Sequence, residues 1–499
     1  MDTVNKRHVT SYNTWVVLFA TLGSITYGYC TSIIATTLGQ PTFLHYFNLD
    51  SSGNAAAITG GLNGLYQAGG LFGSLSSAWA ADKVGRRKAI GAAAMTCILG
   101  GALQAGSAHV AMFMIARFIT GFGTGALVTL VPMWQSEVSS PATRGFLVGM
   151  HGVFILVGYS LASWVGVGFF FVNAGGAQWR IPLAIQTIPP FLLACGIMRL
   201  PESPRWLISR GIMDEAMEIL GKLHGRPTTD GEENYAALEF KQIQDQLSLD
   251  AVLPCSWASL FTVPSYRRRA VVGFLVMFCA QCTGTQVINN YGPSLYASIG
   301  FGSRDQLLLQ AGWISVGIIG NFVNALLLDH AGRKYVMVTG LGGTAVALLG
   351  EAVMLALYQG SGNAAGISAA VFFLFLHIVF YASCLDASTY VYASEIWPTH
   401  IRSKGTAFST SGLFLSSLIL LTVSPTAFDA IGWRYYLVLM SFTVLSIFVF
   451  ALLFPETKGL ALEEVGRLFK DAVVEIQGVE ADGQYSALAG KLEQDKSSA

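Results

Sequence analysis

The sequence predicts an all-α membrane protein with twelve transmembrane helices in two pseudo-symmetric six-helix halves. The 499 residues are 53% hydrophobic and only 12% charged, which is about half the charge of a typical soluble domain. Twelve apolar runs reach about 20 residues, the length that a helix needs to cross a bilayer. The expected spans are 14–36, 57–80, 88–107, 110–133, 146–170, 180–200, 270–296, 308–328, 335–358, 367–393, 405–427 and 433–454.

Short polar phrases between the apolar runs occur twice, and this repetition predicts the two halves. The phrase from Asp82 to Lys88 returns as Asp329 to Lys334, roughly 250 residues later. Three further pairs share nearly this offset: Ser136-Glu137 with Ser394-Glu395, Trp179-Arg180 with Trp433-Arg434, and Pro201-Glu202-Ser203 with Pro455-Glu456-Thr457. Duplicated membrane units typically transport a solute through the seam between them.

The positions of the basic residues predict the orientation. Lys and Arg gather in the connections after the even-numbered spans and are nearly absent after the odd-numbered ones, Arg304 being the exception. By the positive-inside rule, both termini and the long middle loop are expected in the cytosol. We expect an N-terminal half over 1–200, a cytosolic loop with short amphipathic helices over 201–269, a C-terminal half over 270–455, and a cytosolic tail over 456–499 that is disordered at its end.

Composition and motifs also exclude several classes of function. The formal net charge is zero, so no global positive field favours nucleic acid. Six of the seven cysteines fall inside the expected spans at no ligand spacing, so they predict packing residues and no metal site. The sequence has no nucleotide-binding loop and no nucleophile constellation. We therefore expect neither an enzyme nor a cofactor.

Five phrases, in this order along the chain, carry a family resemblance. They are Asp82 to Arg87, Arg117-Phe118 with Gly121, Gly123 and Gly125, Pro201 to Leu207, Glu395-Ile396-Trp397-Pro398, and Pro455 to Gly459. With these phrases the chain resembles a sugar porter of the major facilitator superfamily, most similar to fungal members, from about residue 15 to 470. The resemblance implies two six-helix halves that close alternately around one sugar site near the membrane midplane.

The repeated loop phrases suggest a gate at the cytosolic side. The resemblance implies that arginines at helix ends pair with acids of neighbouring helices when this side is closed. Charge pairs made in one state and broken in the other bias a two-state equilibrium. The alternative is that the arginines only enforce orientation and bind lipid phosphate. The candidate gating residues are Asp82, Arg86, Arg87, Glu137, Arg144, Asp329, Arg333, Glu395 and Arg402.

The sugar site is expected where polar side chains interrupt a span, and the seventh span is the richest. Gln281, Gln286, Asn289 and Asn290 are spaced so that their amides lie near one helix face. The resemblance implies that this segment supplies much of the sugar contact, although Gln286 stands where the family usually has asparagine. The alternative is that these amides only join neighbouring helices.

Other positions of the expected sugar site depart further from the family pattern. Tyr390 and Phe414 stand where the family has tryptophans, so aromatic stacking on the sugar is kept in kind. The glutamine of span 5 falls at Gly152, with His151 beside it. The asparagine of span 8 falls at Gly317, with Asn321 and Asn324 one and two turns further on. We expect His151, Tyr390 and Phe414 to take part in binding, although a buried histidine is also a common packing residue.

The residues expected to couple transport to protons are altered as well. Proton-linked members pair an aspartate of span 1 with the arginine of span 4, but here Cys30 replaces the acid and Arg117 remains. Arg117 therefore finds another partner or lies near enough to the outer surface to be hydrated. The titratable groups left inside spans are Asp386, Glu351 and His151. The missing acid favours facilitated diffusion, and Asp386 is the expected proton site if the protein is a symporter.

The sequence thus predicts a carrier that moves a monosaccharide or a related small sugar or polyol across the plasma membrane by alternating access. It is expected to work as a monomer in the lipid bilayer, as a facilitator or a proton symporter. The alternative is a transporter-like sugar sensor that signals through its cytosolic segments. Such sensors usually have longer cytosolic extensions than this chain shows.

Overall fold

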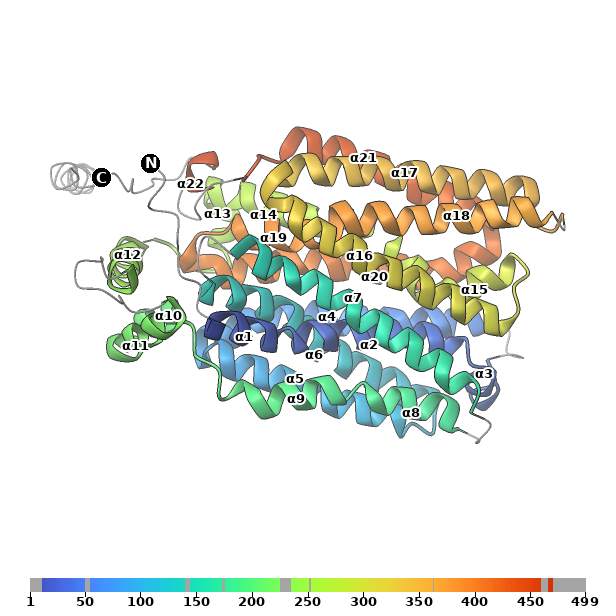
Figure 1. Cartoon of the computed structure of the whole chain (residues 1–499), viewed down its shortest axis with the longest axis horizontal. Helices are drawn as coiled ribbons and strands as arrows, with labels where there is room; N and C mark the ends of the chain where they lie inside the picture. The colour runs from blue at the N-terminus through green and yellow to red at the C-terminus, as the bar shows by residue number, and fades with distance from the viewer. Residues whose placement is uncertain are drawn as a thin grey trace.

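A computed structural model describes residues 11–49, 54–139, 144–172, 176–224, 235–250, 253–361, 363–458 and 465–469. Long helices run side by side along the longest axis of the molecule (Figure 1). The short helices α10 to α13 and α22 lie at one end of this bundle, together with the start of α1. We call this the insert end. The short helix α3 lies at the opposite end.

In the described residues, the first half is built of helices. They are α1 (Ser11–Ala20), α2 (Leu22–Leu38), α3 (Pro41–Tyr46), α4 (Ala55–Val84), α5 (Arg86–Ala105), α6 (Val110–Val138), α7 (Arg144–Phe170), α8 (Ala177–Ile185) and α9 (Ile188–Ile197).

The helices of the second half follow a short helical insert. The insert contains α10 (Pro204–Ser209), α11 (Met213–His224), α12 (Tyr235–Asp250) and α13 (Ser259–Thr262). The second half contains α14 (Pro264–Gln281), α15 (Thr285–Ser298), α16 (Ser303–Ala331), α17 (Arg333–Tyr358), α18 (Ala364–Tyr381), the π-helical turn η1 (Ala382–Asp386), α19 (Ala387–Glu395), the 3-10 turn η2 (Thr399–Ile401), α20 (Arg402–Ile431), α21 (Arg434–Leu453) and α22 (Val465–Leu468).

Eleven of the twelve expected spans are long and apolar enough in the described residues to cross a membrane. The expected span 57–80 lies within α4, a 30-residue helix that is not among the eleven. Glycine, serine and amide residues lower the hydropathy of α4. The helix can contain them because it packs between other helices. It contacts α6 of its own half and α20 of the other half. The prediction of an all-α membrane bundle is confirmed.

Glycines let α4 approach its two neighbours closely. A Cβ atom at Gly69 or at Gly121 would collide with the backbone carbonyl of Phe118 or Tyr66, respectively, across the α4–α6 contact. On the other side, a Cβ at Gly60 would lie 2.6 Å from the Thr422 carbonyl oxygen of α20. Small residues are the usual means of close helix packing in a membrane, where the lipid supplies no hydrophobic driving force.

Two helices of the second half are broken near the middle of the bundle. The seventh span is divided into α14 and α15 by a turn in which Gly284 has φ +78°. This conformation favours glycine, because a Cβ would be strained there. The tenth span changes from α18 through η1 to α19. Short π-helical turns within a helix often mark functional sites.

The insert packs against the first half. Ile208, Ala216 and Leu220 are buried with residues of α1, α5 and α6, and Asn13 Nδ2 of α1 donates to the Leu223 carbonyl oxygen of α11 at 3.5 Å. The amphipathic helices that the sequence suggests here correspond to α11 and α12. The expected disordered end of the tail lies outside the described residues.

Replacing Gly121 with valine should destabilise the protein strongly, because the added Cβ meets a backbone carbonyl that has no rotamer to give way. Overpacking typically costs about 1–3 kcal/mol. We expect a lower midpoint of thermal unfolding for the detergent-solubilised protein. The matched control is Gly342→Val, since a Cβ at Gly342 has no heavy atom within 4 Å. Equal midpoints for the two variants would contradict this account of the α4–α6 contact.

Candidate functional site

The candidate site lies at the seam between the halves, beside the breaks in the seventh and tenth spans. Here α15, η1 and α19 of the second half face α2 and α7 of the first half. Contacts join α15 to α2 and α19 to α7. Most residues that the sequence suggests for sugar binding meet in this region.

The amides of the seventh span form hydrogen bonds in this region. Gln286 Nε2 donates across the seam to the Tyr159 hydroxyl at 2.9 Å, and Asn290 Nδ2 donates to the Gln286 carbonyl oxygen at 2.8 Å. Gln281 Nε2 donates to the Tyr381 hydroxyl at 3.3 Å. Gln281 Oε1 is buried without a hydrogen-bond partner among the described residues. An unsatisfied acceptor of this kind is available to a ligand hydroxyl.

Asn289 points toward a different pair of helices. Its Oδ1 accepts a hydrogen bond from Ser32 of α2 at 3.3 Å and one from Gln310 of α16 at 3.5 Å. Its Nδ2 has no partner among the described residues. Asn289 therefore joins the two halves beside the candidate site rather than at its centre.

The aromatic residues expected in the site do lie at the seam. His151 packs edge-on against Tyr390 with ring centroids 5.2 Å apart, and Phe414 packs edge-on against Tyr27 at 6.2 Å. His151 Nδ1 lies 2.7 Å from the Ser24 hydroxyl, while its Nε2 has no partner among the described residues. His151 is thus packed against Tyr390, and within the described ranges one of its ring nitrogens forms no hydrogen bond.

Asp386 ends the π-helical turn η1 and is 7% exposed. Its Oδ2 accepts a hydrogen bond from Asn321 Nδ2 of α16 at 2.7 Å, and Asn321 Oδ1 accepts from the Ala387 N–H at 3.2 Å. The Asn321 amide also fills the space beside Gly152, where a Cβ would lie 3.1 Å from Nδ2. Asn321 and Ala387, the residue after Asp386, therefore lie against Gly152, the neighbour of His151 in the sequence.

Arg117 of α6 is 1% exposed, so the expectation that it is hydrated near the outer surface is wrong. Its Nη1 donates to the Cys30 carbonyl oxygen at 3.0 Å, and the guanidinium lies 4.1 Å from the centre of the Tyr66 ring. Its Nη2 donates to Asn63 Oδ1 at 3.4 Å. Within the part of the chain that the structure describes, no carboxylate pairs with Arg117.

The Arg117 contacts continue across the seam toward the opposite end. Asn63 Nδ2 donates to the Tyr291 hydroxyl of α15 at 2.9 Å, and this hydroxyl donates to the Leu421 carbonyl oxygen of α20 at 2.7 Å. The buried arginine thus orients an amide that holds α15 against the first half.

Glu351 of α17 lies away from the candidate site. It is buried near Tyr296 of α15 and Tyr436 of α21, inside the second half. Neither of its carboxylate oxygens has a hydrogen-bond partner among the described residues. Glu351 is therefore a buried titratable group of the ninth span that does not belong to the candidate site.

The candidate gating residues gather at the insert end, where an arginine of each half pairs with a glutamate of the same half. Arg86 Nε contacts Glu137 Oε2 at 3.1 Å in the first half. Arg333 Nη2 contacts Glu395 Oε1 at 3.3 Å in the second half. The repeated phrases therefore place the same pair twice.

A duplicated glutamate also caps the N-termini of α5 and α17. Glu202 Oε1 accepts from the Arg86 N–H at 3.0 Å, and Glu456 Oε1 accepts from the Arg333 N–H at 2.9 Å. A carboxylate at a helix N-terminus satisfies free N–H groups and favours the helix dipole. Burial raises the pKa of the Glu202 carboxyl, while hydrogen bonds from the Ser203 and Arg87 N–H groups act in the opposite direction.

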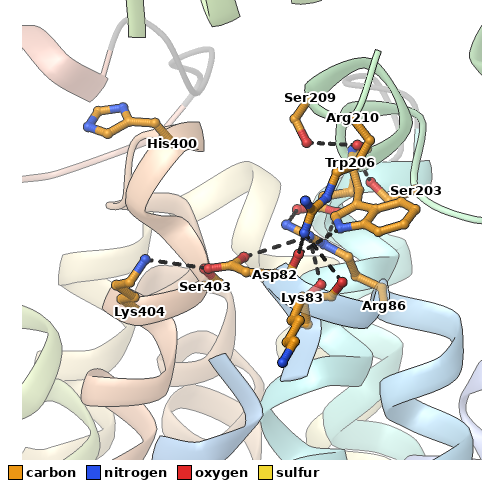
Figure 2. A network of polar contacts seen from close by, with 12 residues as sticks. Asp82, Lys83, Arg86, Ser203, Trp206, Ser209, Arg210, His400, Ser403 and Lys404 are labelled. Atoms are coloured by element: carbon orange, nitrogen blue, oxygen red, sulfur yellow. Dashed lines mark hydrogen bonds and ion pairs between the residues drawn. The ribbon is translucent and has the colours of Figure 1, made fainter. Parts of the chain in front are cut away.

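Asp82 joins the halves across the seam at the insert end (Figure 2). Its Oδ2 accepts from the Ser403 hydroxyl at 2.8 Å and contacts Lys404 Nζ at 3.5 Å, both on α20. Its backbone carbonyl accepts from Trp206 and Arg210 of the insert. The insert thus holds the same loop that contacts the second half.

The other candidate gating residues differ in their placement. The Arg87 guanidinium donates from Nη1 to the carbonyl oxygens of Met198 and Leu200, and its backbone N–H donates to the Glu202 carboxylate. Arg402 is buried, lies close enough to Glu137 to interact with it, and donates from Nε to the Trp397 carbonyl oxygen. The side chains of Arg144 and Asp329 lie outside the described residues.

A cavity of roughly 340 Å³ lies at the opposite end of the seam. Residues of both halves line it, among them Thr59 of α4, Tyr291 and Ser298 of α15, and Asp429 of α20. Tyr291 belongs both to this cavity and to the contact that holds α15 against α4.

The site also contains three tyrosines that the sequence analysis did not identify as site residues: Tyr27, Tyr159 and Tyr381. The Tyr27 hydroxyl interacts with the side chains of Tyr159 and Tyr390. A tyrosine in the middle of an apolar span carries a hydroxyl that needs a partner. From this requirement Tyr159 and Tyr381 could have been predicted as hydrogen-bonding residues, but their partners could not.

Comparisons with known proteins agree with this architecture. The family model described as "Sugar (and other) transporter" matches residues 16–469. The MFS-type transporter criB of Aspergillus cristatus is 33% identical over 458 residues, 91% of this chain and 92% of that protein. The quinate permease of Emericella nidulans is 30% identical over 478 residues, 92% of this chain and 89% of the permease.

A solved structure of the E. coli proton:xylose symporter XylE, bound to 6-bromo-6-deoxy-D-glucose, has the same fold. It superposes with a TM-score of 0.81 at 24% identity and covers 93% of this chain and 100% of XylE. The predicted twelve-helix arrangement in two halves is thereby confirmed. The chain belongs to the sugar (and other) transporter family of the major facilitator superfamily.

Proposed function

We propose that the protein carries a monosaccharide or a related small polyol across the plasma membrane by alternating access. Its family makes it a multi-pass membrane transporter of small metabolites and not an enzyme. The observation that carries the finer proposal is the polar and aromatic site at the seam, to which both halves contribute. Amides, tyrosine hydroxyls and aromatic faces in an apolar surrounding suit a hydroxyl-rich ligand.

Contacts across the seam support alternating access. Asp82 joins the halves at the insert end, Gln286 in the middle, and Asn63 toward the opposite end. A carrier exposes its site to one side at a time, so it must break one set of these contacts while it keeps the other. We also propose a gating role for the ion pairs Arg86–Glu137 and Arg333–Glu395, which lie within each half at the insert end.

The proposed orientation places the insert end in the cytosol. The basic residues Lys83, Arg86, Arg87, Lys334 and Lys404 all lie there, as the positive-inside rule requires. The cavity at the opposite end would then face the outside. We propose that the protein acts as a monomer, because the site is built within one chain.

The proposal is tested by uptake of labelled hexoses and polyols in cells that lack their own hexose carriers. Net uptake is expected for at least one of them, whereas binding without uptake would favour a sensor. Gln281→Ala should raise the apparent KM at least several-fold, because it removes a buried hydrogen-bonding partner, a loss of about 1–3 kcal/mol. The matched control Gln306→Ala changes a glutamine at the opposite end of the bundle. Unchanged kinetics at normal surface expression would refute the assignment of Gln281.

We further propose that transport is facilitated diffusion. The usual acid of the first span is absent, and Arg117 is held by the Cys30 carbonyl oxygen, Asn63 and the Tyr66 ring. These partners do not titrate near neutral pH, so the arginine pairs without a proton carrier.

A protonophore should therefore leave the steady-state level of internal substrate unchanged, equal to the external concentration. The measurement is uptake of the transported solute with and without the protonophore. Accumulation that the protonophore abolishes would show a symporter instead. In that case Asp386→Asn should abolish accumulation and spare solute exchange, and continued accumulation by this variant would point to Glu351 or His151.

A further inference from the structure

Asp386 is the carboxylate at the candidate site, and facilitated diffusion leaves it without a role in proton coupling. An intramembrane acid is costly and is usually functional. Its contacts are those of a hydrogen-bond acceptor that faces the ligand region. This inference rests on the proposed function and concerns which solutes the carrier accepts.

The orientation of the Asn321 amide shows how Asp386 is used. The Ala387 N–H can only donate, so the Asn321 atom facing it at 3.2 Å must be the oxygen. Nδ2 then faces Asp386 Oδ2 at 2.7 Å and donates to it. This oxygen is therefore held as an acceptor. Asp386 Oδ1 is not engaged by any hydrogen bond among the described residues.

Among the described residues, the groups that interact electrostatically with Asp386 are tyrosines. Its carboxylate interacts electrostatically with Tyr27, Tyr159, Tyr381 and Tyr390, which surround it from four different helices. In the described ranges, no lysine or arginine pairs with it. The buried cation Arg117 is engaged elsewhere, with Cys30 and Asn63. A negative charge of the ligand would therefore meet a negative charge with no cation between them.

We propose that Asp386 makes the carrier selective for uncharged polyhydroxylated solutes and excludes the same solutes when they bear a carboxylate. A ligand hydroxyl can donate to Oδ1, whereas a ligand carboxylate cannot. Like charges within a few ångströms repel strongly in a medium from which water is largely excluded. The quinate permease relative shows that carboxylates are a relevant alternative for this family.

The test compares two pairs of probes that differ in a carboxylate: D-glucose with D-glucuronate, and myo-inositol with quinate. For whichever pair is transported, wild-type protein should take up the neutral member at least about tenfold faster than the acid, given the repulsion expected at such distances. Asp386→Asn should slow uptake of the neutral member several-fold and reduce the ratio by at least tenfold. The measurement is initial uptake at matched surface expression.

Two charge-matched controls locate the effect. Asp429→Asn removes a carboxylate from the cavity at the opposite end, and Asp305→Asn removes an exposed one from the start of α16. Both should leave the ratio unchanged. A ratio that collapses in Asp429→Asn and persists in Asp386→Asn would overturn the inference, because selection would then occur at the entrance.

The wild-type ratio remains decisive even if Asp386→Asn is not expressed. Equal uptake of both members of a pair, or preference for the acid, would overturn the inference while leaving the carrier proposal intact. Absence of uptake and of binding for all four probes and for the wider panel of sugars would overturn the proposed function, and this inference with it.

Discussion

Polar groups buried inside an apolar bundle must find their partners within the protein, and in this chain many of those partners lie across the seam. Ser32 reaches Asn289, Gln286 reaches Tyr159, and Asn63 reaches Tyr291. Lipid supplies no hydrogen bonds, so each of these contacts can be given up only if another replaces it. A solute with several hydroxyl groups is such a replacement. The same requirement that closes the seam therefore supports the proposal that a solute binds there.

The duplication of the chain is clear at the insert end, where the same geometry occurs twice. Gly85 and Gly332 have φ of +94° and +86°, and Glu202 and Glu456 hold the helix that follows each of them. The copies differ most at the site. Cys30 stands in place of the acid in the first half, and Asp386 supplies a carboxylate in the second half. The carboxylate of this chain thus lies in the half that does not contain Arg117. This placement fits a role in solute selectivity rather than in proton coupling.

Much of the fold could be predicted from the sequence, because a membrane span is a property of local composition and length. Even the glycine-rich α4 was expected as a span, because the apolar run over 57–80 is long enough to cross a bilayer. The π-helical turn at residues 382–386 could not be predicted, because tertiary packing and not local propensity selects its hydrogen bonds.

The candidate site was predicted in its residues more than in its contacts. Gln286 and Tyr390 could be proposed from residue type, but their partners Tyr159 and His151 come from the other half of the chain. The arginines show the same limit. Arg86 and Arg87 are adjacent in one phrase, but the helix turns one toward Glu137 and the other toward backbone carbonyls. Only the packing of α5 against α6 and α9 distinguishes them.

The central claim is that the two halves must move relative to each other around the seam. Ser160 of α7 and Ser315 of α16 face each other across it, with their Oγ atoms 3.2 Å apart. A variant with cysteine at both positions should form a disulfide on oxidation, lose uptake, and regain uptake on reduction, while each single cysteine variant keeps uptake under both conditions. Full uptake by the oxidised double variant, with the cross-link demonstrated, would contradict the account.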